Sequence, residues 1–148
     1  MLKHTLLHPE ILHAIARAGH HGRILLADGN YPASTTLGPN ARLVSLNLSP
    51  GVVTVCQVLD AILATVPIEK AFVMDYERTG PYALREDPPV WNDFRGLLKK
   101  HGLGFDLQLV EKWQFYKEVT VPSHILTVQT ADTQIFANLV LDIGVRMA

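Results

Sequence analysis

The sequence contains a single cysteine, few charged residues and no long apolar run. Because Cys56 has no second cysteine to pair with, no disulfide can form within the chain. Its apolar neighbours indicate a small core residue rather than a nucleophile. No segment approaches the roughly 20 apolar residues that cross a bilayer. The segment from Met1 to Pro9 also lacks the apolar run of a signal peptide. We therefore expect a soluble, cytoplasmic protein without a membrane partner.

Charge of either sign is scarce. Charged residues make up 18% of the chain, and 13 Lys and Arg against 14 Asp and Glu leave a formal net charge of -1. No basic stripe stands out, so nucleic acid is not an expected partner. The low charge content indicates that more surface is buried than in a monomer, which favours a homo-oligomer.

Motifs of several common catalytic sites are also missing. The seven histidines form no His-x-His, His-Glu-x-x-His or Cys-His cluster, so their spacing predicts no metal site. The glycines form neither a phosphate-binding loop nor a dinucleotide fingerprint, and no Gly-x-Ser-x-Gly elbow is present. Five scattered histidines are interpreted as surface or edge residues: His4, His8, His13, His101 and His124. We expect no cofactor.

The chain does contain an alternation of helices and strands. Apolar residues at helical spacing, bounded by start and stop signals, predict helices at residues 9–18, 49–65, 89–101 and 112–119. Short apolar runs predict strands at residues 24–27, 42–48, 71–74, 105–110, 124–128 and 139–143. The last strands lack a full helix between them, which argues against an all-parallel sheet. We predict one α/β domain over residues 1–148 with a layered, mixed sheet.

Polar groups flank the strand predicted at residues 24–27. His20 and His21 precede it between two glycines, where they fit either a polar turn that ends the first helix or a pair of acid/base groups. Asp28 follows the strand. Catalytic carboxylates often lie at strand ends in α/β folds, but an Asx-type turn explains this residue equally well. The residues alone leave both alternatives open.

Two segments near the carboxyl end combine aromatic side chains with polar groups. Residues 112–117 hold cations among aromatics, a mixture that suits a sugar, although Trp113 and Phe115 could instead pack a short helix into the core. Residues 136–138 supply an aromatic ring and an amide just before the last strand. Two long loops, at residues 28–40 and 75–89, have the length typical of functional loops.

Taken in order, these pieces resemble the signature of the ribose pyranase/fucose mutarotase (RbsD/FucU) family. The resemblance rests on Gly19-His20, Asp28, Pro32-Ala33, Phe115-Tyr116, Phe136-Ala137-Asn138 and Gly144-Val145. It runs from about residue 2 to the end, and Tyr31-Pro32-Ala33 is closer to the fucose branch. It implies a single-domain three-layer α/β/α fold with a mixed sheet. It also implies a ring-shaped homo-oligomer, with a decamer as one candidate.

The same resemblance implies an isomerase that interconverts the anomers, and also the ring forms, of a free monosaccharide such as L-fucose or a related aldose. It makes His20 the proton donor and assigns sugar binding to Asp28, Lys112, Phe136, Ala137 and Asn138. No metal is implied. Lys112 stands where the family has arginine or histidine, and Phe136 where it usually has tyrosine, so the sugar preference is open.

Two other functions remain open, a D-ribose pyranase and a non-catalytic sugar-binding accessory of carbohydrate uptake. An assembly role alone would require the polar loops to be incidental. The spacing of His20 and Asp28 raises a separate question, because eight extended residues would place them roughly 26 Å apart. They can share a site only if the histidine loop folds back or if neighbouring subunits pair.

Overall fold

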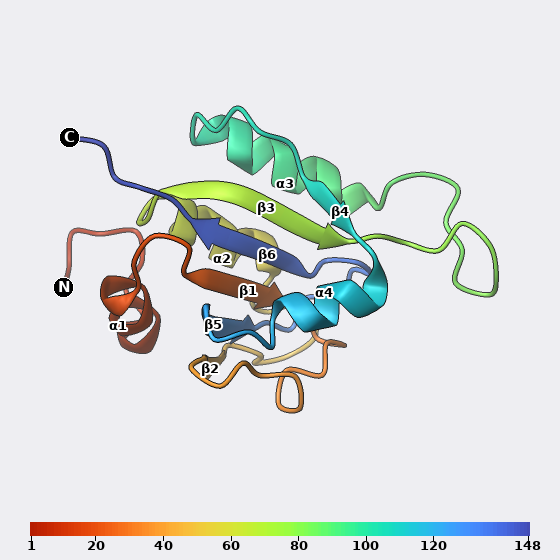
Figure 1. Ribbon diagram of the computed structural model, residues 1–148, viewed down its shortest axis with the longest axis horizontal. Coiled ribbons are helices and arrows are strands. Elements are labelled where there is room, and N and C mark those ends of the chain that lie inside the picture. Colours follow the sequence, from red (N-terminus) through yellow and green to blue (C-terminus); the bar gives the residue numbers. More distant parts are fainter.

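A mixed sheet of six strands, in the order β2-β5-β1-β6-β3-β4, forms the centre of the computed structural model, which describes residues 1–148 (Figure 1). The strands are β1 (Arg23–Ala27), β2 (Arg42–Ser45), β3 (Ile68–Met74), β4 (Gln108–Val110), β5 (His124–Gln129) and β6 (Leu139–Ile143). The helices are α1 (Pro9–Arg17), α2 (Val55–Leu63), α3 (Pro89–Lys100) and α4 (Lys112–Glu118). None of these helices has the length and apolar character needed to cross a membrane.

Strand direction determines which loops meet. β6 is antiparallel to both of its neighbours, β1 and β3, whereas the other pairs in the sheet are parallel. The ends of β1 and β3 therefore lie beside the segment that leads into β6, at what we call the carboxyl edge. The starts of β1 and β3 lie beside the end of β6, at the opposite amino edge.

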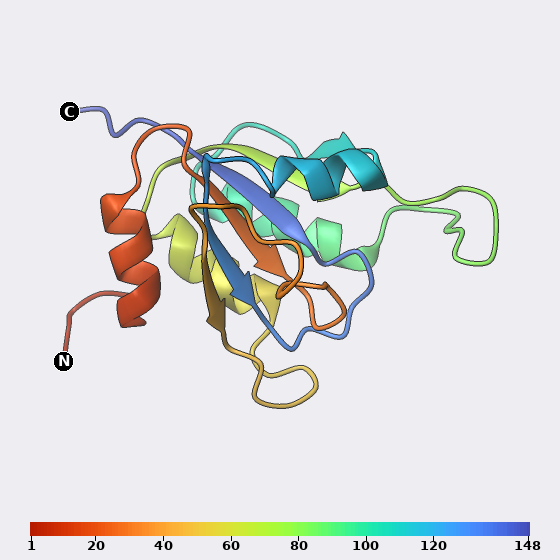
Figure 2. The same ribbon diagram turned by 60° about the horizontal axis from the view of Figure 1, so that its bottom comes forward.

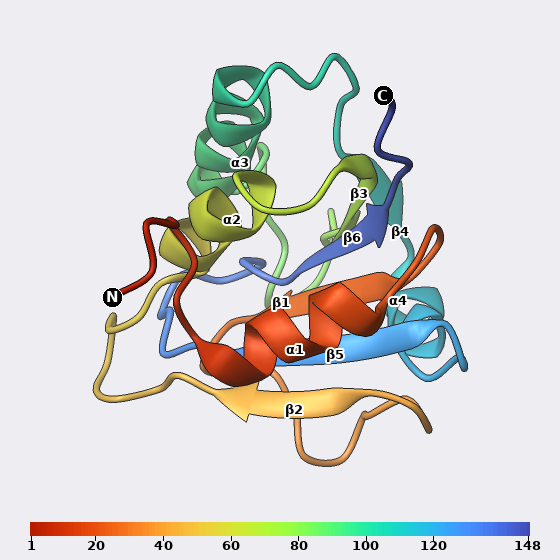
Figure 3. The same cartoon turned by 90° about the vertical axis from the view of Figure 1, so that its left-hand side faces the viewer.

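Helices cover both faces of the sheet. α1, α2 and α3 lie on one face and α4 lies on the other (Figure 3). Side chains of β1 alternate between the faces, as expected for a strand covered on both sides. Ile24 and Leu26 join the main core cluster with α1, α2 and α3, whereas Leu25 and Ala27 join a smaller cluster with Phe115 of α4. This arrangement confirms the three-layer α/β/α prediction.

Element boundaries differ from the sequence prediction most clearly at α2. This helix begins at Val55 rather than at residue 49, because Thr54 forms a capping box with Gln57. The Thr54 hydroxyl accepts the Gln57 backbone N–H at 3.3 Å, and the Gln57 side chain accepts the Thr54 N–H at 2.9 Å. β2 and β4 are also shorter than predicted, and β3 begins earlier, at Ile68.

The interpretation of His124 as a surface or edge residue is wrong. Its side chain is fully buried, its Nδ1 donates to the Val119 carbonyl oxygen, and its Nε2 lies 3.0 Å from the Thr127 hydroxyl, which can donate to it. These contacts pair the polar atoms of the imidazole inside the protein, which is what allows a histidine to be buried.

Two expectations for the core are confirmed in part. Phe115 is fully buried and attaches α4 to the sheet, whereas Trp113 is 66% exposed. Cys56 is half-buried against the main core cluster, and burial raises the pKa of its thiol to about 11. Little thiolate therefore exists at neutral pH, so Cys56 is a poor nucleophile.

Candidate active site

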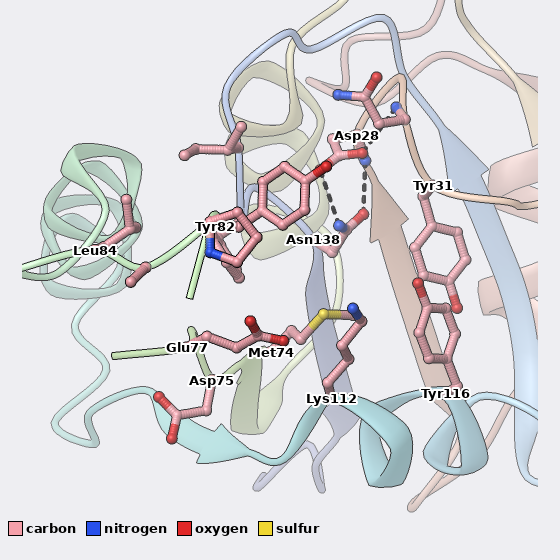
Figure 4. Close-up of a pocket in the computed structure, with 15 residues that line it drawn as sticks. Asp28, Tyr31, Met74, Asp75, Glu77, Tyr82, Leu84, Lys112, Tyr116 and Asn138 are labelled. Atoms are coloured by element: carbon pink, nitrogen blue, oxygen red, sulfur yellow. Dashed lines mark hydrogen bonds between the residues drawn. The ribbon is translucent and has the colours of Figure 1, made fainter. Parts of the chain in front are cut away.

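A cavity of about 490 Å³ opens at the carboxyl edge of the sheet (Figure 4). Its volume lies within the range of small-molecule sites. Its walls come from the loop after β1, the end of β3 with the loop that follows, α4, and the segment before β6. Apolar and polar side chains both contribute, as in sites that bind and orient an organic ligand.

Four of the six side chains predicted from the sequence line this cavity, namely Asp28, Lys112, Phe136 and Asn138. The antiparallel course of β6 explains their meeting, since it brings residues 136–138 back to the end of β1. The Ala137 side chain is fully buried in the main core cluster and does not line the cavity. Only its backbone is left to contribute to the site.

Asp28 and Asn138 form a reciprocal pair in the cavity wall. The Asn138 Nδ2 donates to Asp28 Oδ2 at 2.8 Å, and the Asp28 backbone N–H donates to Asn138 Oδ1 at 2.9 Å. Both residues are buried, with 3% and 7% of their surfaces exposed. Because each polar group has a partner that holds its rotamer, the carboxylate faces the cavity in a defined orientation.

Burial raises the pKa of the Asp28 carboxyl above its ordinary value. Nearby Asp132 acts in the same direction, whereas hydrogen bonds from the Asn30 and Tyr31 backbones and from Asn138 act against it. The Asn30 N–H donates to Asp28 Oδ1 at 2.9 Å, so the Asx-type turn considered from the sequence is present. The Asp28 side chain can therefore form the turn and also face the cavity, because Oδ1 accepts from Asn30 and Oδ2 accepts from Asn138.

Aromatic rings form a wall beside this carboxylate. Tyr31 stacks on Tyr116 of α4 with 5.6 Å between ring centroids, and both line the cavity. Burial raises the pKa of Tyr31 to about 12, so its phenol stays protonated at neutral pH. Lys112 begins α4 and contributes a cation to the same cavity. The wall therefore offers flat apolar faces next to hydrogen-bond donors.

Phe136 lines the cavity with a backbone that bulky residues rarely adopt. Its φ is 58°, in the left-handed region. Trp91 of α3 donates its indole N–H to the Phe136 carbonyl oxygen at 3.0 Å, and Tyr76 packs edge-on against the Phe136 ring. These contacts hold a strained residue at the cavity, where such strain is commonly found in functional sites.

The sequence did not identify all of the lining residues. Glu77, Tyr82 and Leu84 come from the loop after β3, which extends beyond the body of the protein (Figure 2). Met74, at the end of β3, was not identified either. The length of the loop at residues 75–89 was the available signal, because long loops in small domains are often functional.

His20 lies away from the cavity, at the amino edge. Its Nε2 is 3.0 Å from Glu69 Oε2, at the start of β3. β1 separates His20 from Asp28 within the chain, and its five residues span roughly 16 Å. The histidine loop does not fold back along the strand, so one chain does not bring the two predicted groups together.

Comparisons with known proteins match the chain to one family. A family model described as the RbsD / FucU transport protein family matches residues 1–146. A human protein named fucose mutarotase is 30% identical over 153 residues, which cover 95% of this chain and 90% of the human protein. A D-ribose pyranase of Paracidovorax citrulli is 33% identical over 73 residues, about half of each chain.

A solved structure gives the same fold. The fucose mutarotase of Streptococcus pneumoniae, determined in complex with L-fucose, matches with a TM-score of 0.82 over 99% of this chain and 100% of that one. At 24% sequence identity this likeness supports the fold rather than the ligand. The chain thus shares both its sequence pattern and its architecture with one family of proteins.

Proposed function

Because the chain belongs to the RbsD/FucU family, we propose that it is a mutarotase, an isomerase that interconverts the anomers of a free monosaccharide. The observation that carries the proposal is the buried Asp28–Asn138 pair, which faces a cavity of ligand size together with Lys112. A carboxylate, an amide and a cation are the groups that bind sugar hydroxyls. The aromatic wall of Tyr31 and Tyr116 suits the apolar face of a sugar ring.

Interconversion of anomers requires the hemiacetal to open and close again. An acid protonates the ring oxygen while a base takes the proton of the anomeric hydroxyl, and the open aldehyde rotates before the ring recloses. We assign the acid to His20, because an imidazole exchanges protons near neutral pH. Asp28, held by Asn138, orients the sugar and is a candidate base. One positioned acid or base is typically worth about 10²- to 10⁴-fold in rate.

His20 can act on a sugar in this cavity only if it comes from a neighbouring copy of the chain. Two observations support this part of the proposal. The His20 side chain is 42% exposed at the amino edge, and β1 keeps it away from the Asp28 of its own chain. We therefore propose a ring-shaped homo-oligomer in which the amino edge of one subunit faces the cavity of the next. A cytoplasmic location is part of the proposal, and the unpaired cysteine supports it.

L-Fucose is the substrate we favour. It is a 6-deoxy sugar, and its methyl group needs apolar contact. Met74, Leu84 and Ile135 supply such contact in the cavity wall. The human fucose mutarotase matches nearly the whole chain, whereas the ribose pyranase of Paracidovorax citrulli matches half of it. D-Ribose, which lacks this methyl group, remains the second candidate on the strength of that partial match.

Saturation-transfer NMR on free aldoses tests the proposal. The protein should accelerate exchange between the anomers of L-fucose, and a panel that includes D-ribose should rank the substrates. Replacing His20 with alanine should lower the exchange to nearly the spontaneous rate, whereas His13→Ala, an exposed histidine on α1, should leave it unchanged. Sugar binding without accelerated exchange would instead identify a non-catalytic accessory of carbohydrate uptake.

A further inference from the structure

Three side chains at the amino edge form a compact cluster of metal-ligating atoms. His20 Nε2 lies 3.0 Å from Glu69 Oε2, and His21 Nδ1 lies 3.3 Å from Glu69 Oε1. The imidazole rings stack with 3.6 Å between centroids. One ligand atom from each residue lies within 4.8 Å of the others. The cluster was not predicted from the sequence, because Glu69 is far from the histidines along the chain.

The local backbone presents these side chains to one another. His21 has a φ of 66°, in the left-handed region, and its N–H donates to the Ile143 carbonyl oxygen of β6 at 2.9 Å. Gly144 leaves room for Glu69, since a Cβ at this glycine would lie 3.2 Å from the Glu69 Cβ. The starts of β1 and β3 and the end of β6 therefore hold the cluster together.

The geometry suits a tetrahedral transition-metal ion. Zinc binds histidine nitrogen and carboxylate oxygen at roughly 2.0–2.2 Å, so its tetrahedral ligands lie roughly 3.3–3.5 Å apart. The two imidazole–carboxylate contacts, at 3.0 and 3.3 Å, are close to this value but go to different oxygens of Glu69. With one oxygen as the ligand, the three ligand atoms lie within 4.8 Å of one another and need to approach by about 1.5 Å at most. Within one chain the side chains of His20, His21 and Glu69 are 42%, 67% and 32% exposed, so the chain itself does not cover the cluster.

We propose that His20, His21 and Glu69 bind one Zn²⁺ ion per chain, with water as the fourth ligand. The bound ion occupies the Nε2 of His20 and prevents it from giving a proton to the sugar. Zinc is thus an inhibitor rather than a cofactor of this protein. The binding site stands on the geometry alone, whereas the inhibition rests on the proposed mutarotase function.

Zinc titration of the assembled, metal-free protein, in competition with a chromogenic chelator, tests the site. We expect one tight Zn²⁺ per chain and no competition from Mg²⁺, which disfavours imidazole ligands. His21→Gly is the informative variant, because glycine accepts the left-handed backbone while the imidazole is removed. It should weaken zinc binding by at least about tenfold. His13→Ala is the matched control and should bind as the unmodified chain does. Absence of tight binding, or equal binding by His21→Gly, would overturn the site.

The same variants test inhibition by zinc. His21→Gly retains both His20 and Glu69, and its own rate of anomer exchange without metal is the reference for its response to zinc. One equivalent of Zn²⁺ should abolish exchange in the unmodified protein and leave His21→Gly active, and a chelator should restore the rate. Exchange that continues with the site fully occupied would refute the inhibition. If no variant catalyses exchange, the mutarotase proposal fails, and the chelator titration still decides the metal site.

Discussion

Two inactive variants of this protein should restore activity when they assemble in one particle. The first, His20→Ala, lacks the proposed acid but keeps the whole cavity. The second, Asp28→Asn, keeps the acid but loses the carboxylate. A catalytic acid must come within about 3 Å of the atom that it protonates. Because β1 alone spans roughly 16 Å between the two groups, no single chain can supply both to one sugar.

The magnitude of the recovery follows from counting subunit pairs. A shared site is intact when the subunit that gives the histidine is the Asp28→Asn chain and the subunit that gives the cavity is the His20→Ala chain. In equal, random co-assembly each condition holds for half of the positions, so about one quarter of the sites are intact in a ring of identical contacts. At other ratios the recovered rate should follow the product of the two fractions.

The experiment uses co-expression of the two variants, with the ratio of chains in the particles measured by intact mass. Anomer exchange of L-fucose is then compared with that of each variant alone and of separately assembled particles mixed without subunit exchange. Both controls should be inactive. If co-assembled particles show no recovery at any ratio, each site takes both groups from one chain, and the proposed arrangement of subunits is wrong.

Three further changes have defined outcomes. Asn138→Ala removes both hydrogen bonds between Asn138 and Asp28. It should lower the free energy of unfolding in urea by about 1–3 kcal/mol and raise KM for the sugar. An unchanged KM would contradict the role of Asn138 in orienting Asp28. Lys112→Met should raise KM for the sugar roughly tenfold in the NMR assay of anomer exchange. Lys112→Arg keeps the charge and should raise KM less. Equal effects of the two variants would exclude a role for the charge. Burial lowers the pKa of His124 in the folded chain, so as the pH falls the unfolded chain binds a proton at this residue before the folded chain does. The contribution of His124 to stability should therefore be complete above about pH 6.5 and should decrease as the pH falls below that value. His124→Gln should flatten this pH dependence of the unfolding free energy, and an unchanged slope would assign it to other groups.

Most helices and strands of the fold can be predicted from the sequence, because the patterns that mark them are local. Pro9 and the apolar spacing that follows it mark α1, and the run from Ile24 to Ala27 marks a strand covered on both faces. The start of α2 differs from the sequence prediction because a valine-rich segment precedes the cap at Thr54. The partners of His124 lie within five residues of it, but they surround the imidazole only because of the way the chain turns from α4 into β5, which residue type and spacing could not reveal.

The site was predictable in its parts but not in its arrangement. Asp28 and Asn138 each stood out beside a predicted strand, yet their pairing depends on the antiparallel course of β6, which no local pattern encodes. The resemblance to a family grouped Ala137 with its neighbours. The alternation of side chains before β6 turns it into the core instead. Glu69 had no signal at all, because its partners His20 and His21 come from the distant loop before β1.

The reversal of β6 creates both polar groupings in the molecule. At the carboxyl edge it returns Asn138 to the end of β1, where the carboxylate is buried, oriented and partnered. At the amino edge it carries Ile143 and Gly144 to the start of β1 and of β3, where His20, His21 and Glu69 remain exposed. The carboxylate at the carboxyl edge is buried in the wall of a cavity of ligand size, whereas the imidazoles at the amino edge are largely exposed. Each edge therefore lacks what the other has, and the proposed contact between copies would join them without any change in the fold.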